Sequence, residues 1–573
     1  MSIEIRDFTF TYYGRKRPAL TNINIKVEAG SIVGVLGPAG SGKSTLVMAL
    51  NGLVPKAFPG KTIGDVIVNG LNTRDHELTE LSAHVGIVLA NPAHQLFALS
   101  VEDDVAFGPA NMGLPANEIR DRVRIAMQAT RLEGFQNRNP NELSGGEQQS
   151  LAIAGVLAMR PKIMALDEPV AMLDPVGKQR VLSVITEINK SYGNTTIVTE
   201  AGSNIEVLVG VLDRLIVFQE GRIVADGRPS DILARTELEI ARPVVTDLFL
   251  RMQKKDPKLK VPISVEEAAE YIGNVMMERN KRIHRPTPHE EERSAPRGNP
   301  IVKVRNLYHT YPGKIQALRG VSFDIDAGSM VGILGQNGSG KTTLSYHLVG
   351  LLKPTKKDAQ VIVDGADVTR SSINEVTKHI NYVFQNPENQ LFCETVREEI
   401  AFGLKMRGLS LEAINERVRE TLALFGAEDH IEDPIIFTSL DLKTYVAIAS
   451  ILALTPKVLI VDEPATALDR TRIARVMSVL KDLNKSGWTI LVITHQIDDV
   501  AIFCDHLIVM KEGAILTQGT TKEVFSKPEL LREAFLNPPQ ITQLAQRLRK
   551  FEFPTDIMTT DAMEDFLWKN VFG

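Results

Sequence analysis

One long pattern occurs twice in this sequence, and that duplication limits the possible folds more than any other feature. AGSIVGVLGPAGSGKSTL at 29–46 recurs as AGSMVGILGQNGSGKTTL at 327–344. Likewise, MALDEPVAMLD at 164–174 recurs as LIVDEPATALD at 459–469. Repeats of this length at nearly constant spacing indicate two homologous domains in one chain.

The domain boundaries are predicted from the repeat and from a change of composition between its copies. We expect a first domain at 1–250, a linker with a short helix at 251–298, a second domain at 299–525 and a C-terminal helical extension at 526–573. The linker helix is indicated by the capping-box spacing of Ser264 and Glu267. After it, RPTPHEEERSAPRGNP is charged and proline-rich, as is typical of a solvated connector.

The composition excludes several classes of protein. A hydrophobic fraction of 43% with 24% charged residues is that of a globular protein. The net charge of −5 argues against a nucleic-acid binder held by phosphate contacts. Cys393 and Cys504 are far apart and indicate neither a disulfide framework nor a zinc site. Without a signal core or an apolar run of about 18 residues, we expect a soluble or peripheral protein that needs partner chains for any membrane role.

Short apolar runs indicate the fold class. SIVGVLG, KIMALDE, SMVGILG and KVLIVDE end in Gly or an acidic residue, and helical patterns lie between them. Buried parallel strands with chemistry at their carboxyl ends have this pattern. The prediction is an α/β protein with two tandem P-loop domains, each with a mainly parallel sheet and a helical subdomain.

Two glycine-rich loops predict nucleotide binding. GPAGSGKS at 37–44 and GQNGSGKT at 335–342 both fit G-x-x-x-x-G-K-[ST]. Glycines let successive N–H groups point at one phosphate, the lysine reaches the β/γ-phosphates, and the final hydroxyl binds Mg²⁺. The expected ATP-binding residues are Gly37, Gly40, Ser41, Gly42, Lys43, Ser44 and Thr45 in the first domain, and Gly335, Asn337, Gly338, Ser339, Gly340, Lys341, Thr342 and Thr343 in the second.

Further motifs resemble those of the ATP-binding cassette (ABC) ATPases. LSGGEQQ at 143–149 matches the family signature, while LDEP at 166–169 and VDEP at 461–464 look like Walker B motifs. AMLD at 171–174 and TALD at 466–469 resemble D-loops. The resemblance implies the following roles: Mg²⁺ ligands Asp167, Asp462 and Gln385, general bases Glu168 and Glu463, and adenine-stacking Tyr12 and Tyr311. For either tyrosine, a half-buried strand aromatic is the alternative.

A narrower resemblance concerns the segments 90–108 and 385–403. ANPAHQLFALSVEDDVAFG and QNPENQLFCETVREEIAFG look like the N-P-x-x-Q-L-F segment of energy-coupling-factor (ECF) transporter ATPases. This likeness implies an energising subunit on the cytoplasmic face of the cell membrane. Its partners would be a transmembrane coupling subunit and a substrate-binding membrane subunit, and its cargo a vitamin or a transition-metal ion.

The family's domains pair head to tail, so the resemblance implies two composite ATP sites. The site on the second loop has all the family's residues. Its catalytic set is Glu463, His495 and Gln385, and it borrows the signature Ser144, Gly145, Gly146, Glu147 and Gln148 from the first domain.

The other site departs from the pattern at the following positions: Ala90 replaces the Q-loop glutamine, Glu200 the switch histidine, and Leu440 and Asp441 the signature glycines. We expect Leu440 to obstruct backbone approach, and Asp441 and Glu200 to bring carboxylates toward the γ-phosphate. Two unit charges about 4 Å apart repel by about 4 kcal/mol at an effective dielectric near 20. We therefore predict that this degenerate site holds ATP and hydrolyses it slowly.

Two other functions fit parts of this pattern. A soluble tandem ABC ATPase acting on ribosomes or nucleic acid is one, although such proteins often have a basic surface and two competent sites. The ATPase subunit of an ABC importer outside the ECF group is the other.

Overall fold

The computed structural model describes residues 2–143, 145–171, 173, 175–278, 300–312, 315–464, 468, 470–494, 497–555 and 557–573. Ser144 and His495, two of the expected site residues, lie outside this range, as do most of the two D-loop segments and residues 279–299 of the expected linker. The chain divides into two compact units, Met1–Tyr271 and Ile272–Gly573.

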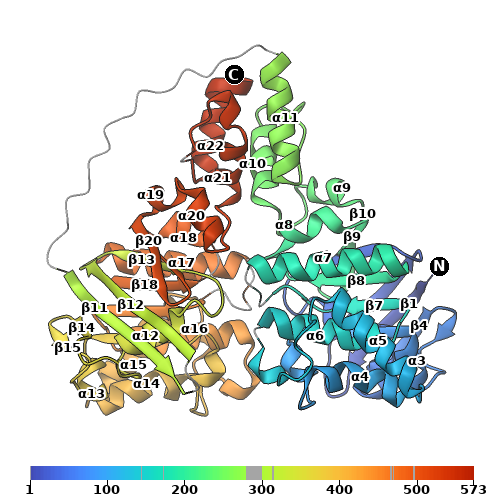
Figure 1. Ribbon diagram of the computed structural model, residues 1–573, viewed down its shortest axis with the longest axis horizontal. Helices are drawn as coiled ribbons and strands as arrows, with labels where there is room; N and C mark the ends of the chain where they lie inside the picture. The colour runs from blue at the N-terminus through green and yellow to red at the C-terminus, as the bar shows by residue number, and fades with distance from the viewer. Residues whose placement is uncertain are drawn as a thin grey trace. The chain divides into compact units, whose positions relative to one another are not determined.

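The first unit contains two sheets (Figure 1). A four-stranded antiparallel sheet has the order β2-β1-β4-β5, and a six-stranded sheet has the order β10-β9-β3-β8-β7-β6. All neighbours in the larger sheet are parallel except the edge strand β10. The strands are β1 Ile3–Tyr12, β2 Leu20–Val27, β3 Ile32–Leu36, β4 Gly60–Val68, β5 Leu71–Asn72, β6 Val85–Val88, β7 Ile163–Leu166, β8 Thr195–Glu200, β9 Arg214–Gln219 and β10 Arg222–Gly227.

Both faces of the larger sheet are covered. Val33 of β3 belongs to a core with Val47 of the following helix, whereas its neighbour Ile32 packs in a second core with Leu151 and Val181 of two other helices. Since both faces are buried, the strand reads as a continuous apolar run. The helices are α1 Lys43–Leu50, α2 Leu53–Lys56, α3 Leu78–His84, α4 Val101–Asn111, α5 Ala116–Ala129, α6 Gly145–Ala158, α7 Pro175–Tyr192, α8 Ile205–Leu208, α9 Pro229–Leu233 and α10 Val244–Gln253. The boundary between the two units falls within the next helix, α11 Val265–Glu278.

The second unit repeats this plan. Its sheets have the orders β12-β11-β14-β15 and β16-β17-β18-β13-β19-β20. The strands are β11 Pro300–Tyr311, β12 Ile315–Asp326, β13 Met330–Leu334, β14 Gln360–Val363, β15 Ala366–Asp367, β16 Ile380–Val383, β17 Val458–Asp462, β18 Thr489–Thr494, β19 His506–Lys511 and β20 Ala514–Thr520. The predicted α/β fold with two tandem domains is confirmed.

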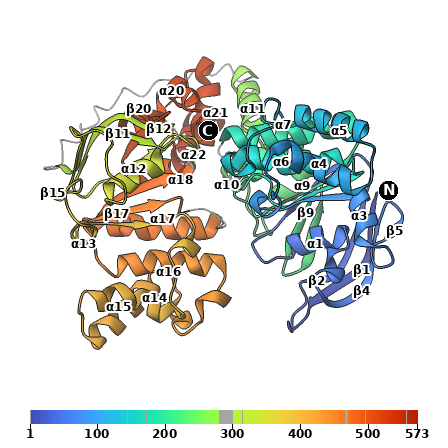
Figure 2. The ribbon, with the colours of Figure 1, turned by 60° about the horizontal axis from the view of Figure 1, so that its bottom comes forward.

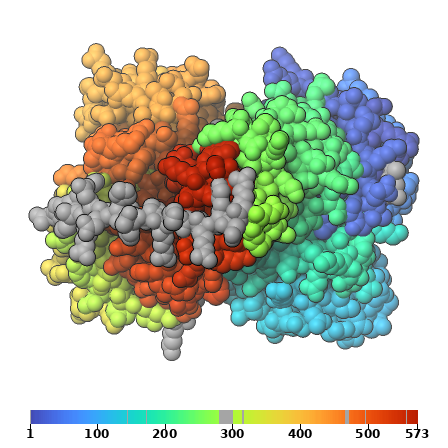
Figure 3. Space-filling view, turned by 90° about the horizontal axis from the view of Figure 1, so that it is seen from above, coloured from blue at the N-terminus to red at the C-terminus, as the bar shows by residue number. Residues whose placement is uncertain are grey.

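Three helices of the second unit form a separate lobe below the sheet, labelled α14, α15 and α16 in Figure 2. The C-terminal helices follow β20, the edge strand of the larger sheet. In Figure 3 their red atoms lie directly against the orange atoms of the same unit. The helices of this unit are α12 Lys341–Leu348, α13 Ile373–Val376, α14 Val396–Met406, α15 Leu411–Ala423, α16 Leu440–Leu452, α17 Arg470–Lys485, α18 Ile497–Phe503, α19 Thr521–Phe525, α20 Pro528–Glu533, α21 Gln540–Arg547 and α22 Thr560–Leu567.

Candidate nucleotide-binding sites

The first glycine loop joins β3 to α1 and closes around a lysine. Gly42 has φ 103°, in the left-handed region that favours glycine. A Cβ atom there would lie 2.6 Å from the carbonyl oxygen of Ala19, so no larger residue fits. The Nζ of Lys43 donates hydrogen bonds to the carbonyl oxygens of Gly37 at 2.7 Å and Pro38 at 3.1 Å. The loop is therefore curved around the lysine ammonium group.

The second loop, between β13 and α12, has the same geometry. Gly340 has φ 98°, and the Nζ of Lys341 donates to the carbonyl oxygens of Gly335 at 2.7 Å and Gln336 at 3.0 Å. The two loops therefore differ in sequence but not in how they hold the lysine.

One serine side chain in each loop has no hydrogen-bond partner among the described residues. Ser41 and Ser339 are buried, and neither Oγ atom has a partner in the described part of the chain. An unsatisfied buried hydroxyl costs about 1–3 kcal/mol. A phosphate oxygen at the start of α1 or α12, where helix N–H groups are free, would satisfy it. The residues present therefore fit nucleotide phosphates, with the hydroxyls of Ser44 and Thr342 available to Mg²⁺.

At the end of β7, the carboxyl group of Glu168 lies beside the lysine of the first loop. Glu168 has φ 45°, and its Oε1 is 3.5 Å from the Nζ of Lys43. Thr199 accepts a hydrogen bond from the Glu168 N–H at 3.0 Å and donates one to Asp167 Oδ1 at 2.6 Å. Burial raises the pKa of Glu168 to about 7, with Glu200 and Asp167 adding to the rise and Lys43 opposing it. A carboxyl group with this pKa is partly protonated at neutral pH.

At the end of β17, the arrangement around the acidic pair is different. The O–H of Tyr382 donates to Asp462 Oδ2, and the Oγ1 of Thr494 donates to Glu463 Oε2 at 3.1 Å. Burial raises the pKa of Asp462 to about 6, opposed by Tyr382, Lys341 and the hydroxyl of Thr342. Thr342 and Asp462, two of the expected Mg²⁺ ligands, are thus close enough to interact.

The Q-loop positions follow the strands next to these acidic pairs. Ala90 lies just after β6, which pairs in parallel with β7, and Gln385 lies just after β16, which pairs in parallel with β17. Each position is therefore beside the carboxyl end that carries Asp167 or Asp462. Gln385 offers an amide there, and Ala90 does not.

Glu200 is placed differently from our expectation. It ends β8 and is 3% exposed, and its Oε1 accepts hydrogen bonds from the N–H groups of Gly202 at 2.9 Å and Asn204 at 3.1 Å. The carboxylate therefore holds its own turn. The strand registers correct its assignment: Glu200 pairs with Leu36 of β3 as Thr494 pairs with Leu334 of β13, so Glu200 is the counterpart of Thr494 and not of the switch histidine. Glu200 adds to the rise in the pKa of Glu168, and its approach to a phosphate stays a prediction.

In the signature segment of the first unit, glycines let the start of α6 lie close to α7. Gly145–Gln148 form the first turn of α6, and a Cβ atom on Gly146 would lie 3.4 Å from the Cα of Gly177 on α7. The Nε2 of Gln148 donates to the carbonyl oxygen of Pro140 at 3.1 Å. Small residues on both helices leave the start of α6 unobstructed.

The second unit has an ion pair in place of these glycines. Asp441, the counterpart of Gly146, has its Oδ2 3.1 Å from the Nε of Arg472, the counterpart of Gly177. Its charge is therefore paired within its own unit, and the expectation that it brings a carboxylate toward the γ-phosphate stays a prediction. Leu440, at the first position of α16, is 40% exposed, so the obstruction expected from this side chain stays a prediction.

The two tyrosines occupy equivalent places. The hydroxyl of Tyr12 is 3.1 Å from the Oγ1 of Thr45, and that of Tyr311 is 3.3 Å from the Oγ1 of Thr343. Both are half-buried. Adenine stacking by either ring stays a prediction. Sequence reasoning did not single out the neighbouring Tyr13, which is 88% exposed.

Two functional features were missed in the sequence. Tyr382 replaces Ile87 of the first copy, and that polar-for-apolar change in a buried strand was the available signal. The glutamines of the N-P-x-x-Q-L-F segments fold each segment back on its own unit. Gln95 Oε1 accepts from the N–H of Leu89 at 2.7 Å, and Gln390 Oε1 accepts from the N–H of Phe384 at 3.2 Å.

No helix in the described part of the chain combines the length and the apolar character that a membrane span requires.

The family model for ABC transporters matches residues 20–171 and 318–466. A protein of Caldanaerobacter subterraneus subsp. tengcongensis, named as an ABC transporter ATP-binding protein, is 37% identical over 96% of both chains. One of Methanosarcina mazei with the same description is 35% identical over 99% of this chain and 97% of its own. The solved cbiO1 from Clostridium perfringens, described as part of the ABC transporter complex cbiONQ, is 37% identical over 44% of this chain and 100% of its own, with a TM-score of 0.38.

Proposed function

Because the chain belongs to the ABC transporter family, whose ATPases bind and hydrolyse ATP, we propose that it is the energy-coupling subunit of an ECF-type importer. The cargo would be a small nutrient, either a vitamin or a transition-metal ion. The chain would act at the cytoplasmic face of the cell membrane with a transmembrane coupling subunit and a substrate-binding membrane subunit.

The observation that carries this proposal is an exposed aromatic pair on each unit. Phe97 and Phe107 meet edge to face with ring centroids 4.5 Å apart, and Phe392 and Phe402 do so at 4.8 Å. All four rings are among the exposed large hydrophobic side chains. Exposed apolar groups at equivalent places in two domains support docking of a partner.

Rigid loops hold these aromatic pairs. Asp104 Oδ2 accepts hydrogen bonds from the N–H groups of Phe97 at 3.2 Å and Ala98 at 3.0 Å. Glu399 Oε2 accepts from those of Phe392 at 2.9 Å and Cys393 at 2.8 Å. In the second unit the loop borders a cavity of about 540 Å³ that is lined by Leu391, Phe392, Ile435, Ile436 and other residues. A short amphipathic helix of a membrane subunit, with one apolar face, would fit this groove.

We further propose that the two domains pair head to tail and form one competent and one degenerate composite ATP site. In the competent site, Lys341 and Ser339 would hold the phosphates, and bound Mg²⁺ would neutralise their charge. Glu463 would accept the proton of the attacking water, and Thr494 would orient its carboxylate. Gly145 and Gly146 of the first unit would bring N–H groups to the γ-phosphate.

In the degenerate site, ATP would bind to the intact first loop and be hydrolysed slowly. Ala90 offers no ligand, and the ion pair of Asp441 and Arg472 stands where the other signature has Gly146 and Gly177.

The first experiment is affinity purification of the full chain from gently solubilised native membranes, followed by mass identification of co-eluting proteins. The proposal predicts a multi-span membrane protein at equal yield and a second, variable membrane protein. Recovery with ribosomes would instead support the soluble tandem ATPase, and a single invariant membrane partner would support an importer outside the ECF group.

Two variants test the docking surface itself. Phe97→Asp and Phe392→Asp should each reduce recovery of the membrane partner, and their combination should reduce it at least about tenfold, because a carboxylate in an apolar contact is desolvated without a partner. Ile502→Asp is the matched control, since Ile502 is also exposed but lies on α18. Binding of Mg·ADP verifies that each variant is folded. Equal recovery of the membrane partner with Phe97→Asp, Phe392→Asp and Ile502→Asp would contradict the proposed surface.

A further inference from the structure

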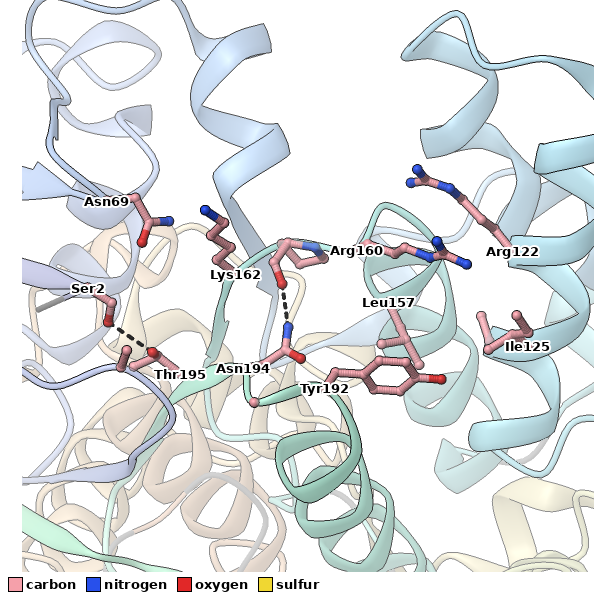
Figure 4. A pocket seen from close by; sticks show the side chains of 14 residues that line it. Ser2, Asn69, Arg122, Ile125, Leu157, Arg160, Lys162, Tyr192, Asn194 and Thr195 are labelled. Atoms are coloured by element: carbon pink, nitrogen blue, oxygen red, sulfur yellow. Dashed lines mark hydrogen bonds between the residues drawn. The ribbon is translucent and has the colours of Figure 1, made fainter.

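The first unit has a cavity of about 390 Å³ at the end of its larger sheet opposite the glycine loop (Figure 4). Lys162 precedes β7, and Asn194 and Thr195 lie at the start of β8, so the cavity lies at the amino ends of these parallel strands. The glycine loop follows the carboxyl end of β3 in the same sheet. The cavity is therefore separate from the nucleotide site, and its volume is in the range of small-molecule pockets.

Two cations at this cavity have no counter-charge. The side chains of Arg160 and Lys162 make no hydrogen bond or ion pair within the part of the chain that the structure describes. The third cation, Arg122, is paired with Glu118 at 2.7 Å and donates to the carbonyl oxygen of Met159 at 3.2 Å. The net charge at the cavity is consequently positive, which favours an anion.

Two buried polar atoms at the cavity also lack partners. Asn194 is 5% exposed, and its Nδ2 donates to the carbonyl oxygen of Pro161 while its Oδ1 accepts no hydrogen bond from the described residues. In Figure 4 this Oδ1 points toward the side of the cavity that Leu157 and Tyr192 line. The Nδ2 of Asn69 is likewise buried without a partner. The lining thus offers one free donor and one free acceptor beside apolar surface, and each unmade hydrogen bond carries a cost.

The second unit has different residues at the equivalent place. There Asp364 stands at the position of Asn69, and its carboxylate is 2.8 Å from the Nζ of Lys457, the counterpart of Lys162. Trp488 stands in place of Asn194 and packs against the apolar core. Thr455 replaces Arg160, and both have positive φ, 50° and 56°.

Three differences therefore act together. The first unit has lost the carboxylate that would neutralise Lys162, has gained the cation Arg160, and has an asparagine where the second unit has an indole ring. Arg160 and Lys162 are exposed, so water solvates their charges, whereas Asn194 Oδ1 and Asn69 Nδ2 are buried without partners among the described residues. A bound group with a negative charge would pair with the cations, bond to the two amide atoms and fill the space.

We propose that this cavity binds a small organic anion, a carboxylate or a phosphate monoester, that has a compact apolar body. The anionic group lies between Lys162 and the Nδ2 of Asn69, and Arg160, which extends toward Arg122 in Figure 4, adds positive charge on the other side of the cavity. The apolar body packs on Leu157 and the Tyr192 ring, and a hydroxyl or amino group of the same molecule donates to Asn194 Oδ1.

The test is calorimetric titration of the full chain, with both glycine loops saturated by Mg·ADP. The probes are 4-hydroxybenzoate, which has an anionic group, a ring and a donor, its neutral isostere 4-hydroxybenzamide, and phenyl phosphate. We expect one of the two anions to bind with a dissociation constant of about 1 mM or tighter, and 4-hydroxybenzamide to bind at least about tenfold more weakly than 4-hydroxybenzoate. The better of the anions distinguishes a carboxylate from a phosphate site.

Variants that copy the second unit should close the cavity. Asn69→Asp and Asn194→Trp should each weaken binding of that anion at least about tenfold, because the first neutralises Lys162 and the second fills the space. Asp364→Asn in the second unit is the control and should leave binding unchanged. Retained Mg·ADP affinity and an unchanged Tm show that the variants fold. Failure of both anions to bind, equal binding of the amide, or wild-type affinity in both variants would overturn the proposal.

Discussion

The two ATP-binding domains have the same strand orders and hold their loop lysines alike, yet the acidic pairs that follow their buried strands have different neighbours. Glu168 is near Glu200 and Lys43, and burial raises its pKa to about 7. In the second domain, burial raises the pKa of Asp462 to about 6, and the Tyr382 hydroxyl, which has no counterpart in the first domain, donates a hydrogen bond to it. A duplicated domain can therefore keep its phosphate-binding backbone while its proton chemistry changes through a few neighbouring side chains.

The largest effect that would sharpen this comparison is on ATP hydrolysis. Glu463→Gln should lower steady-state ATPase activity at least about a hundredfold, because it removes the proposed general base. Glu168→Gln should change the activity less than about twofold. Equal losses in the two variants, measured beside each other at saturating Mg·ATP, would show that both sites turn over.

A second expected effect concerns stability and pH. Folded Glu168 keeps its proton up to about pH 7, whereas an unfolded glutamate releases it near 4.5, so this residue destabilises the fold as the pH rises from 4.5 through 7. Glu168→Gln cannot ionise and should raise the free energy of unfolding of the nucleotide-free chain by about 1–3 kcal/mol at pH 8.

Below pH 4.5 that advantage should vanish. Denaturant unfolding at both pH values measures it, with Glu187→Gln on α7 as a control that lies outside the site. A gain of the same size at both pH values would contradict the assigned pKa.

A third expected effect is partial repair of the degenerate site. Leu440→Gly, Asp441→Gly and Arg472→Gly together copy Gly145, Gly146 and Gly177 of the first domain. In a Glu463→Gln background they should raise the residual ATPase activity about tenfold, because the start of α16 becomes accessible to phosphate. Asp441→Gly alone leaves Arg472 without that partner and should give less. If the triple variant is no more active than its background, another lesion limits this site.

The smallest expected effect is a shift of a pH profile. Tyr382→Phe removes the hydrogen bond that lowers the pKa of Asp462, so that pKa should rise. The acidic limb of kcat/KM should then move about half a unit to higher pH. Tyr308→Phe, on β11, is the control and should leave the limb in place. If the acidic limb of kcat/KM stays in place in Tyr382→Phe, Asp462 is not the group whose titration that limb reports.

Much of the molecule could be predicted from the residues because its signals are local. Glycine loops need left-handed backbone at fixed positions, and buried parallel strands read as apolar runs, so the fold and the lysines were accessible. The partners of Glu200 and Asp441 were not. Both carboxylates were expected to face phosphate, but one caps a turn and the other pairs with Arg472, 31 positions along the chain.

The sequence by itself determined the duplicated α/β fold, the two phosphate loops and the uneven distribution of the family's residues, since each depends on spacing along the chain. Tertiary structure alone decided which charges are compensated. The hydrogen bond of Tyr382 to Asp462, the ion pair of Asp441 with Arg472 and the cavity that Asn69, Lys162 and Asn194 line all bring together residues from different elements. Electrostatic energy depends on distance in space and on burial, and neither can be read from position in the chain.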